Sequence, residues 1–493
     1  MKISKSRFID YRQCPKRLWL GSYRKELADE TDQAAFQMGT MVGELARDLF
    51  PGGVLVEYNG ADGRNIANMI DRTKALITTG EKVIYEAAFA HEGTFAICDI
   101  LARSGNAYDI LEVKASTGVK DVYIDDVAFQ RRVLESCKIS VNRVYILHVN
   151  SGYVRHGALD LNRLFTREDV TERADNIRPG IESSLLAALA MREEDGEPEV
   201  GIGMHCENPY TCPFKGYCFR HVPENSVFDI AGMQLDKKFR LYRDGIITFG
   251  DIRKGKIKLT GKAMVQVDAR LDDSEFINKE RIKGFIDSLG YPLYFLDFET
   301  INPAIPLFDG TRPFQQIPTQ YSLHYIDTEN APPRHSEFLA EEGTDPRRLL
   351  AERLAADIPR DACVLAYNMT FEKTIIRQLA AMYPDLSESL NSIVRNMHDL
   401  MLPFQNRYLY KKDMRGSHSI KNVLPALFPD DPELSYDNLG GVSNGREASA
   451  AYLSLPHLAP EDRERIRREL LEYCRLDTLA MVRIWEELGR RMH

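Results

Sequence analysis

Apolar and polar residues alternate along several short segments in the first third of the chain, and this period of two predicts β-strands. A segment with helical periodicity follows at about Val122–Cys137. Strands mixed with helices in this way indicate an α/β domain from Met1 to about Pro223. The predicted strands cover residues 82–90, 94–102, 107–114 and 143–148.

The last two fifths of the chain show a similar mixture. A strand is predicted from Tyr291 in YPLYFLDFET, with further strands in QYSLHYI, HSEFLA and CVLAY. Helices are predicted near 345–358, from about Thr370, and over Glu461–Met492. Strands first and flanking helices afterwards favour a ribonuclease H-like sheet.

Residues 224–286 lie between these regions and contain short helical patterns separated by basic residues. A chain of 493 residues is too long for one hydrophobic core, so two or three domains are expected. We therefore predict an α/β domain over 1–223, a basic helical connector over 224–286 and a second α/β domain over 287–493.

The composition, 44% hydrophobic and 28% charged, is typical of a soluble globular protein. Because the sequence contains neither a run of eighteen apolar residues nor an apolar signal segment, a cytoplasmic location is expected. The net charge of −9 argues against a protein that coats nucleic acid by bulk electrostatics. Basic residues are nevertheless concentrated in 1–25 and 235–262, either as solvated surface or as a nucleic-acid surface.

A first group of candidate catalytic residues lies on the predicted strands. Glu112 and Lys114 share one strand face, and a hairpin can bring Asp99 beside them. The two carboxylates can hold Mg²⁺ or Mn²⁺ against a phosphodiester, while Lys114 polarises the attacking water. Glu86 can add a metal ligand, and Gln130 can orient water or phosphate. A purely structural salt bridge on a strand would give the same sequence pattern.

Four features follow one another along the first 223 residues in an order and spacing typical of one nuclease family. They are SKSRFIDYRQCPKRLWL, TFAICDIL, LEVKAST and the helix that contains Gln130. In these features residues 1–223 resemble the PD-(D/E)xK nucleases of the RecB and CRISPR-associated exonuclease kind. The resemblance implies a restriction-endonuclease-like fold, with Asp99, Glu112 and Lys114 as the catalytic core.

The sequence departs from this family at two positions. Such domains often carry a histidine on an early helix, where FQMGTMVGELA has Gly43 and Glu44. Their Gln-x-x-x-Tyr motif is represented by Gln130 followed by Leu134. A protein whose first site has lost its activity would show the same departures.

Eight cysteines in a protein expected in the cytoplasm point to metal binding or chance rather than to disulfides. Four of them, one upstream and three close together, can bind zinc or an iron–sulfur cluster. The one-plus-three order matches the cluster-bearing branch of the same nuclease family, which implies a structural [4Fe–4S] cluster. The ligands would be Cys14, Cys206, Cys212 and Cys218, whereas Cys98, Cys137, Cys363 and Cys474 are expected in the core.

A third group of candidate residues lies in the C-terminal region. FLDFET places Asp297 and Glu299 on one strand face, and YCRLD places Tyr473 and Asp477 on one helix face. Glu372 follows the buried strand CVLAY. Converging carboxylates are what a two-metal phosphodiesterase needs, and a tyrosine hydroxyl can hold the attacking water.

Residues 287–493 resemble the DEDD superfamily of 3′–5′ exonucleases in its tyrosine subtype. The resemblance implies Asp297, Glu299 and Asp477 as metal ligands and Tyr473 as the water-positioning residue. Glu372 stands where the family usually has aspartate. Asp399 is either a further acid of the site or a helix cap. The segment RYLYKKDMRGSHSIK is either an amphipathic loop or a segment that binds a single strand by stacking its bases and holding its phosphates. The residues that would do so are Tyr408, Tyr410, Lys411, Lys412 and Arg415.

The leading hypothesis is therefore a nuclease with two metal-dependent sites that trims DNA single strands or ends in repair, recombination or defence. The arrangement of the whole chain also resembles an uncharacterised family of prokaryotic RecB-like nucleases. A nucleic-acid-binding or assembly protein with inactive sites is the alternative from another class, and an RNA-processing exonuclease is a third.

Overall fold

The computed structural model describes residues 2–29, 33–58, 63–191 and 196–492. The protein is mixed α/β and divides into two compact units. Unit 1 comprises Met1–His221 and Pro303–Phe314, and unit 2 comprises Val222–Asn302 and Gln315–His493. The first boundary lies two residues before the predicted one, but the segment Pro303–Phe314 was expected in the C-terminal domain and belongs to unit 1.

A seven-stranded sheet forms the centre of unit 1. β3–β4–β5 are antiparallel and match the predicted strands, and β6 adds in parallel to β5. The order is β2 (Val54–Leu55), β3 (Val83–His91), β4 (Thr94–Ser104), β5 (Ala107–Lys114), β6 (Val141–Val149) and β7 (Phe165–Asp169), with β1 (Ile3–Ser4) paired to the start of β4.

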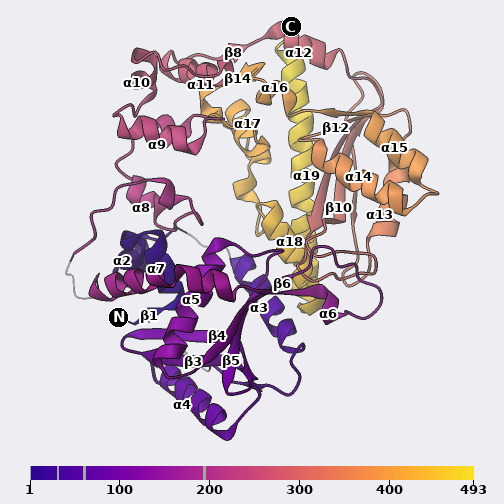
Figure 1. The fold of residues 1–493 in the computed structure, drawn as a ribbon. Coiled ribbons are helices and arrows are strands. Elements are labelled where there is room, and N and C mark those ends of the chain that lie inside the picture. Colours follow the sequence, from indigo (N-terminus) through magenta and orange to yellow (C-terminus); the bar gives the residue numbers. More distant parts are fainter. Residues whose placement is uncertain (1, 30–32, 59–62, 192–195, 493) are drawn as a thin grey trace. The chain divides into compact units, whose positions relative to one another are not determined.

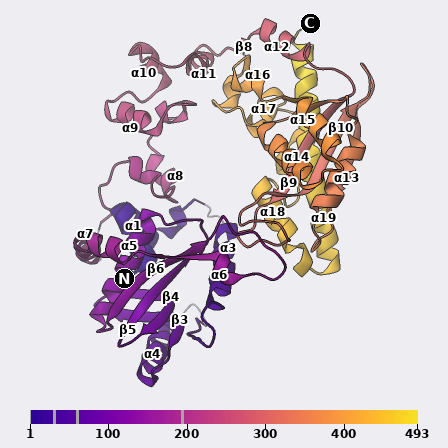
Figure 2. The same cartoon turned by 45° about the vertical axis from the view of Figure 1, so that its right-hand side comes forward.

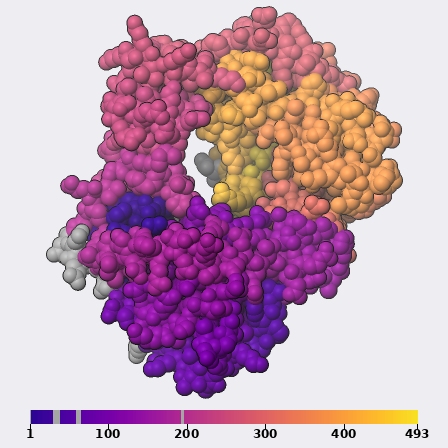
Figure 3. Space-filling view, in the orientation of Figure 1, coloured from indigo at the N-terminus to yellow at the C-terminus, as the bar shows by residue number. Residues whose placement is uncertain are grey.

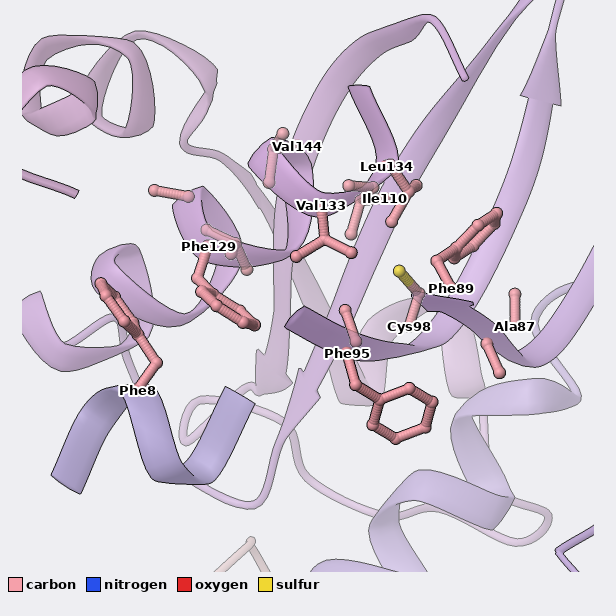
Figure 4. Close-up of a cluster of buried hydrophobic side chains, with 14 of the residues drawn as sticks. Phe8, Ala87, Phe89, Phe95, Cys98, Ile110, Phe129, Val133, Leu134 and Val144 are labelled. Atoms are coloured by element: carbon pink, nitrogen blue, oxygen red, sulfur yellow. The ribbon is translucent and has the colours of Figure 1, made fainter. Parts of the chain in front are cut away.

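Helices cover both faces of this sheet. On one face, Phe8 of α1 stacks on Phe129 of α5 with ring centroids 4.8 Å apart, and Leu134 and Cys98 lie in the same core (Figure 4). On the other face, Ala304 belongs to the core formed with β6 and β7. The helices are α1 (Lys5–Gln13), α2 (Pro15–Tyr23), α3 (Gln33–Arg47), α4 (Gly63–Thr79), α5 (Asp121–Ser136), α6 (Leu161–Leu164), α7 (Thr171–Ala190) and α8 (Lys215–Phe219).

Unit 2 contains a five-stranded sheet with β9 at its centre, between β10 and β12, the two strands of this sheet that Figure 1 labels. β9 pairs antiparallel to β10 and parallel to β12, so its two neighbours run in opposite directions. The order is β11 (Arg334–Leu339), β10 (Ile317–Ile326), β9 (Leu293–Ile301), β12 (Cys363–Ala366) and β13 (Met397–Asp399).

The long helix α19 (Pro460–Arg490) runs along one face of this sheet, and three helices cover the other face (Figures 1 and 2). Those three are α13 (Arg347–Asp357), α14 (Thr370–Met382) and α15 (Ser387–Arg395). The strands and helices predicted for this region are thus present. Shorter helices α16 (Leu402–Gln405), α17 (Ile420–Leu427) and α18 (Gly445–Ser454) lie between β13 and α19 in the sequence.

The predicted connector is not a separate domain. Its helices α9 (Leu235–Arg243), α10 (Phe249–Lys254) and α11 (Gly261–Leu271) share a small hydrophobic core. α11 and α12 (Lys279–Ile286) also contribute Ala269 and Ile282 to the main core of unit 2, and β8 (Phe276–Ile277) pairs with β14 (Leu409–Tyr410). Within the described parts of the chain, no helix has the length and apolar character needed to cross a membrane.

Candidate functional site

Three acids converge between β9 and α19. Leu293 and Phe295 of β9 face the core beside α19, and strand alternation continues that face through Asp297 and Glu299. Asp477 reaches the same place from α19. One carboxylate oxygen from each of Asp297, Glu299 and Asp477 lies within 4.8 Å of the other two. We call these three residues the acid cluster.

The acid cluster is electrostatically unfavourable without a cation. Burial, followed by the charges of Asp477 and Glu299, raises the pKa of Asp297 well above its ordinary value. Burial and Asp477 raise the pKa of Glu299 to about 8. Burial raises the pKa of Asp477 to about 6, although Tyr436 and Lys421 act in the opposite direction. Bound divalent cations would relieve this repulsion, so the donor set fits Mg²⁺ or Mn²⁺.

Two tyrosines flank Asp477. Tyr473 lies one helical turn before it and is buried, as the predicted Y-x-x-x-D pairing requires. The Tyr436 hydroxyl donates a hydrogen bond to Asp477 Oδ1, and its ring centroid lies 6.2 Å from that of Tyr473. Sequence analysis did not identify Tyr436, which lies in a short 3₁₀ turn without periodicity.

One lysine approaches the acid cluster. Lys421, in the first turns of α17, places its Nζ 5.2 Å from the ring centroid of Tyr436 and 5.4 Å from that of Tyr473. Its charge lowers the pKa of both Glu299 and Asp477 against the effect of burial. This residue was also not identified from the sequence, because nothing in SHSIKN distinguishes it from a surface lysine.

Glu372 lies near the acid cluster but is not one of the three converging acids. It lies in the first turn of α14, its side chain is buried, and its Oε2 has no hydrogen-bond partner among the described residues. Burial raises the pKa of Glu372 to about 8, and its charge contributes to the raised pKa of Asp297. Asp399 accepts hydrogen bonds from the backbone N–H groups of Asn368 and Met401, at 3.0 and 2.9 Å. It therefore orders the turn that precedes α14.

Two further sequence features of unit 2 can be placed in the structure. Cys474 is buried as predicted, and its Sγ also lies 3.8 Å from Asp297 Oδ2. The segment RYLYKKDMRGSHSIK does not present its rings for stacking, since Tyr410 is 1% exposed and Tyr408 packs against the same core. Lys411 donates to the Ala426 carbonyl and Lys412 pairs with Asp273, which leaves Arg415 as the exposed cation of the set.

In unit 1, Glu112 is the centre of a buried polar network. Its Oε1 accepts from Lys5 Nζ at 2.6 Å and from Lys114 Nζ at 2.7 Å, and its Oε2 accepts from Gln130 Nε2 at 2.7 Å. Burial would raise the pKa of Glu112, but the charges of Lys114 and Lys5 hold it well below its usual range. The structure thus brings Glu112, Lys114 and Gln130 together as predicted and adds Lys5.

Two aspartates complete this network. Asp126 accepts from Lys114 at 2.7 Å and from Gln130 at 2.9 Å, from the same helix as Gln130 and one turn earlier. Asp99 accepts from the Val113 backbone N–H at 2.7 Å, and burial together with Glu112 raises its pKa to about 7. Asp126 was missed, although its i,i+4 spacing to Gln130 is visible in the sequence.

The remaining predicted residues of the first site lie at its edge. Glu86, in a left-handed conformation within β3, pairs with Arg47 at 2.9 Å. Arg47 ends α3, the early helix that has Gly43 and Glu44 where the resembled nucleases often carry a histidine, and a Cβ built at Gly43 would meet no described atom within 4 Å outside its own stretch of helix. Leu134 is fully buried in the core, so the position of the family's motif tyrosine makes no contribution to the polar network (Figure 4).

The four predicted cysteine ligands line one pocket, together with Lys16, Arg17 and His205. Cys14 lies between α1 and α2, and the other three come from the segment Cys206–Cys218. Gln13 joins the two segments by donating to the carbonyls of His205 and Tyr210, each at 2.7 Å. The pocket therefore connects the two ends of the sequence of unit 1.

The spacing of the thiols bears on which metal could bind. A single tetrahedral zinc ion with Zn–S bonds of about 2.3 Å would hold sulfur atoms ~3.8 Å apart. Among the described residues, no three of the four sulfur atoms lie within 4.8 Å of one another. Burial raises the pKa of Cys212 to about 11 and also raises those of Cys206 and Cys218, so the thiolate forms would need a bound cation. The donor set fits a multi-iron group.

Comparison with known proteins gives relatives without an assigned activity. Residues 294–419 match a family model described as Domain of unknown function (DUF2779). The matched segment contains Asp297, Glu299 and Glu372 but ends before Lys421, Tyr473 and Asp477.

The chain is 26% identical over 391 residues to Uncharacterized protein MG366 of Mycoplasma genitalium, covering 70% of this chain and 58% of that protein. It is 28% identical over 208 residues to the MG366 homolog of Mycoplasma pneumoniae, covering 38% and 31%. Uncharacterized protein UU173 of Ureaplasma parvum is 27% identical over 154 residues, covering 29% and 22%. The chain thus spans less than two thirds of the length of these relatives.

Proposed function

We propose that this protein is a metal-dependent nuclease that hydrolyses phosphodiester bonds at the ends of single-stranded DNA, with its principal active site in the acid cluster. The observation that carries the proposal is the convergence of Asp297, Glu299 and Asp477, which lie up to 180 positions apart in the sequence. A buried group of three carboxylates is costly unless it binds cations. Its raised pKa values express that cost.

The fold supports the same assignment. We propose that unit 2 is a ribonuclease H-like domain of the DEDD type, with β9 as the central strand that carries the first two acids and α19 as the helix that carries the last. Unit 1 is proposed as a restriction-endonuclease-like domain, because Asp99, Glu112, Lys114 and Gln130 lie on β4, β5 and α5 in one polar network.

The residues of the acid cluster have distinct roles in this proposal. Bound Mg²⁺ or Mn²⁺ ions would activate water and stabilise the leaving oxygen. Asp297, Glu299 and Asp477 would hold them. The Tyr436 and Tyr473 hydroxyls both hydrogen-bond to Asp477, and Tyr473 would position the attacking water from this place beside the metal-binding acids.

Lys114 and the cysteine pocket of unit 1 also have roles in this proposal. Lys114 lies at the end of β5 beside Glu112 and would stabilise charge that develops on the phosphate. The pocket of Cys14, Cys206, Cys212 and Cys218 would hold a [4Fe–4S] cluster that joins the ends of the unit, with a structural role.

Nucleic acid is the proposed partner, and a basic segment on the surface of unit 2 would bind its phosphates. Residues 253–262, which run from the end of α10 to the start of α11, contain five basic residues and no acid. Lys254, Lys256 and Lys258 are exposed and form no ion pair with any described residue. This segment, which we call the basic turn, lies in the rose-coloured surface of the space-filling view (Figure 3). The other basic run, 1–25, is largely used in ion pairs with acids of unit 1.

The test is an assay with 5′- and 3′-labelled single strands of DNA and RNA in Mg²⁺ or Mn²⁺. Asp297→Ala should abolish 3′–5′ trimming, and Tyr473→Phe should slow it while leaving metal binding and stability unchanged. In the Asp297→Ala background, residual cleavage would report on unit 1, and Lys114→Ala should reduce it roughly a hundredfold or more. Nucleic-acid binding without cleavage by the wild type would instead support the binding-protein alternative, whereas cleavage of RNA alone would support the RNA-processing one.

A further inference from the structure

An exposed cation beside a buried acid cluster needs an explanation. Lys421 is exposed, yet its Nζ lies over two tyrosine rings that belong to the candidate active site. A lysine close to metal-binding carboxylates weakens metal binding by charge repulsion, so its position is a cost unless it serves another ligand.

The environment of Lys421 holds its ammonium group in place. The Nζ donates to the Ser443 carbonyl, and Ser443 is itself fixed because its N–H and Oγ donate to Glu447 Oε2 at 2.8 and 2.9 Å. Tyr436, one of the two rings beneath the ammonium group, is fixed by its bond to Asp477. The position of the charge is thus set by backbone and side-chain contacts before any substrate arrives.

The remaining hydrogen-bonding capacity of Lys421 is available to a ligand. An ammonium group has three N–H donors, and the Ser443 carbonyl takes one. Lys421 forms no ion pair with a described acid, so its charge is not neutralised by a carboxylate contact. The two tyrosine faces supply only a weak counter-charge.

The start of α18 also lies close to the acid cluster. A side chain built at Gly445, the first residue of this helix, would lie 3.4 Å from Glu299 Oε2. Ser443, which holds Lys421, precedes this residue by two positions. Lys421, Tyr436 and the turn at Ser443–Gly445 therefore form one side of the acid cluster, with an exposed cation at its edge.

We infer that Lys421 forms an anion-binding position at the edge of the acid cluster and takes a non-bridging phosphate oxygen of a bound single strand. This inference rests on the proposed function and adds the residue that holds the phosphate while the acids hold the metal. Lys421 would act as a point charge that places the phosphodiester, and its charge would be most favourable once the strand is bound.

This role predicts changes of opposite sign for the two ligands. In Lys421→Met, Mn²⁺ should bind the acid cluster more tightly, roughly two- to tenfold, because a neighbouring positive charge is removed. A single-stranded oligonucleotide should bind more weakly by about tenfold, because a charge-assisted contact is lost. Lys421→Arg should retain most of the oligonucleotide affinity.

The experiment uses the full chain. Mn²⁺ binding is measured by electron paramagnetic resonance, with the acid-cluster component defined as the part lost in Asp297→Asn. Binding of a fluorescent single strand of about 12 nucleotides is measured by anisotropy, with Ca²⁺ in place of the catalytic ion. Lys411→Met is the matched control, because Lys411 Nζ also donates to a backbone carbonyl, that of Ala426, and should change neither affinity.

Tighter Mn²⁺ binding together with weaker strand binding in Lys421→Met alone would support the anion-binding position. Any other combination would overturn it, including equal effects in Lys421→Met and Lys411→Met, which would indicate a structural role. Absence of an Mn²⁺ component that depends on Asp297 would be a different failure, since it would reject the proposed active site itself.

Discussion

Lys5 Nζ lies 2.6 Å from Glu112 Oε1, although the two residues are 107 positions apart in the sequence. Lys5 begins α1 and Glu112 lies on β5, so this ion pair connects the start of the chain to the centre of the unit 1 sheet. Glu112 is 1% exposed, and its negative charge is balanced by the protein's own cations.

Lys5→Met should lower the free energy of unfolding of unit 1 by about 1–3 kcal/mol in EDTA, because a buried carboxylate loses one of its two cations. The loss should be smaller in Mn²⁺ if an ion bound at Glu112 and Asp99 replaces the missing charge. Urea denaturation in the two buffers measures both effects. Lys2→Met, at an exposed position nearby, is the control. An equal loss in the two buffers would mean that Lys5 is structural and that no ion binds there.

Glu372 should make the metal-free protein less stable at high pH. Its pKa is raised to about 8 from an ordinary value of 4.5, because its side chain is buried. The stability that it contributes is complete below pH 4.5 and is lost as the pH rises through 8. Glu372→Gln should therefore exceed the wild type in stability at pH 8.5 by up to a few kcal/mol, and the difference should shrink towards pH 5. Thermal unfolding in EDTA at several pH values measures this, with the exposed Glu464→Gln as control. A difference that does not change with pH contradicts it.

Glu372→Asp tests whether trimming activity depends on the length of the side chain at this position. Aspartate restores the residue usual in the DEDD superfamily, and trimming activity should be retained or increased. A loss of activity comparable to that of Asp297→Ala would show that the longer side chain is required here.

The four thiols of the cysteine pocket should hold iron. Cys212→Ser in the full chain should remove the brown visible absorbance and make unit 1 sensitive to proteolysis, since the pocket joins α1–α2 to the segment Cys206–Cys218. Cys137→Ser, outside the pocket and against the core of unit 1, should keep the absorbance. One equivalent of zinc and no iron in anaerobically prepared protein would reject the assignment.

The basic turn should contribute to strand binding through its charge. Lys256→Glu/Lys258→Glu should weaken binding of a single strand and reduce the slope of log K against log salt by about 1.4, since each phosphate contact contributes ~0.7. Lys279→Glu/Arg281→Glu introduces the same change of charge at exposed positions of α12 and serves as the matched control. Equal effects of the two double variants would mean that only the net charge of unit 2 matters.

Local periodicity was sufficient to predict strands β3–β6 and β9–β12 and helices α5, α13, α14 and α19, but α4 and α7 were not predicted. β5 begins and ends at the predicted residues, Ala107 and Lys114, because its alternation is regular and its ends carry turns. β1 and β2, of two residues each, have no period to detect. Strand and helix spacing paired Asp297 with Glu299 and Tyr473 with Asp477, whereas the convergence of the two pairs was implied by the resemblance to the DEDD superfamily.

Periodicity could not predict contacts between segments that are distant in the sequence. Lys5 and Lys421 have no local feature that separates them from surface lysines, and Tyr436 lies in a turn. The sequence left open whether the segment around Tyr410 is a stacking surface or an amphipathic loop, because alternating rings and basic residues have the same composition whether the rings face solvent or a core. Asp126 is the exception, since its spacing to Gln130 was available.

The segment Pro303–Phe314 follows β9 directly, yet it is built into unit 1, where Arg155 donates to the carbonyls of Pro306 and Leu307 at 3.0 and 2.8 Å. The polypeptide therefore passes between the units three times rather than once. Cutting the gene at one point cannot yield two complete halves: a fragment ending at His221 lacks residues that fill its own core, including Ala304. Truncation of either unit would meet the same obstacle, because each unit is completed by chain on both sides of the other.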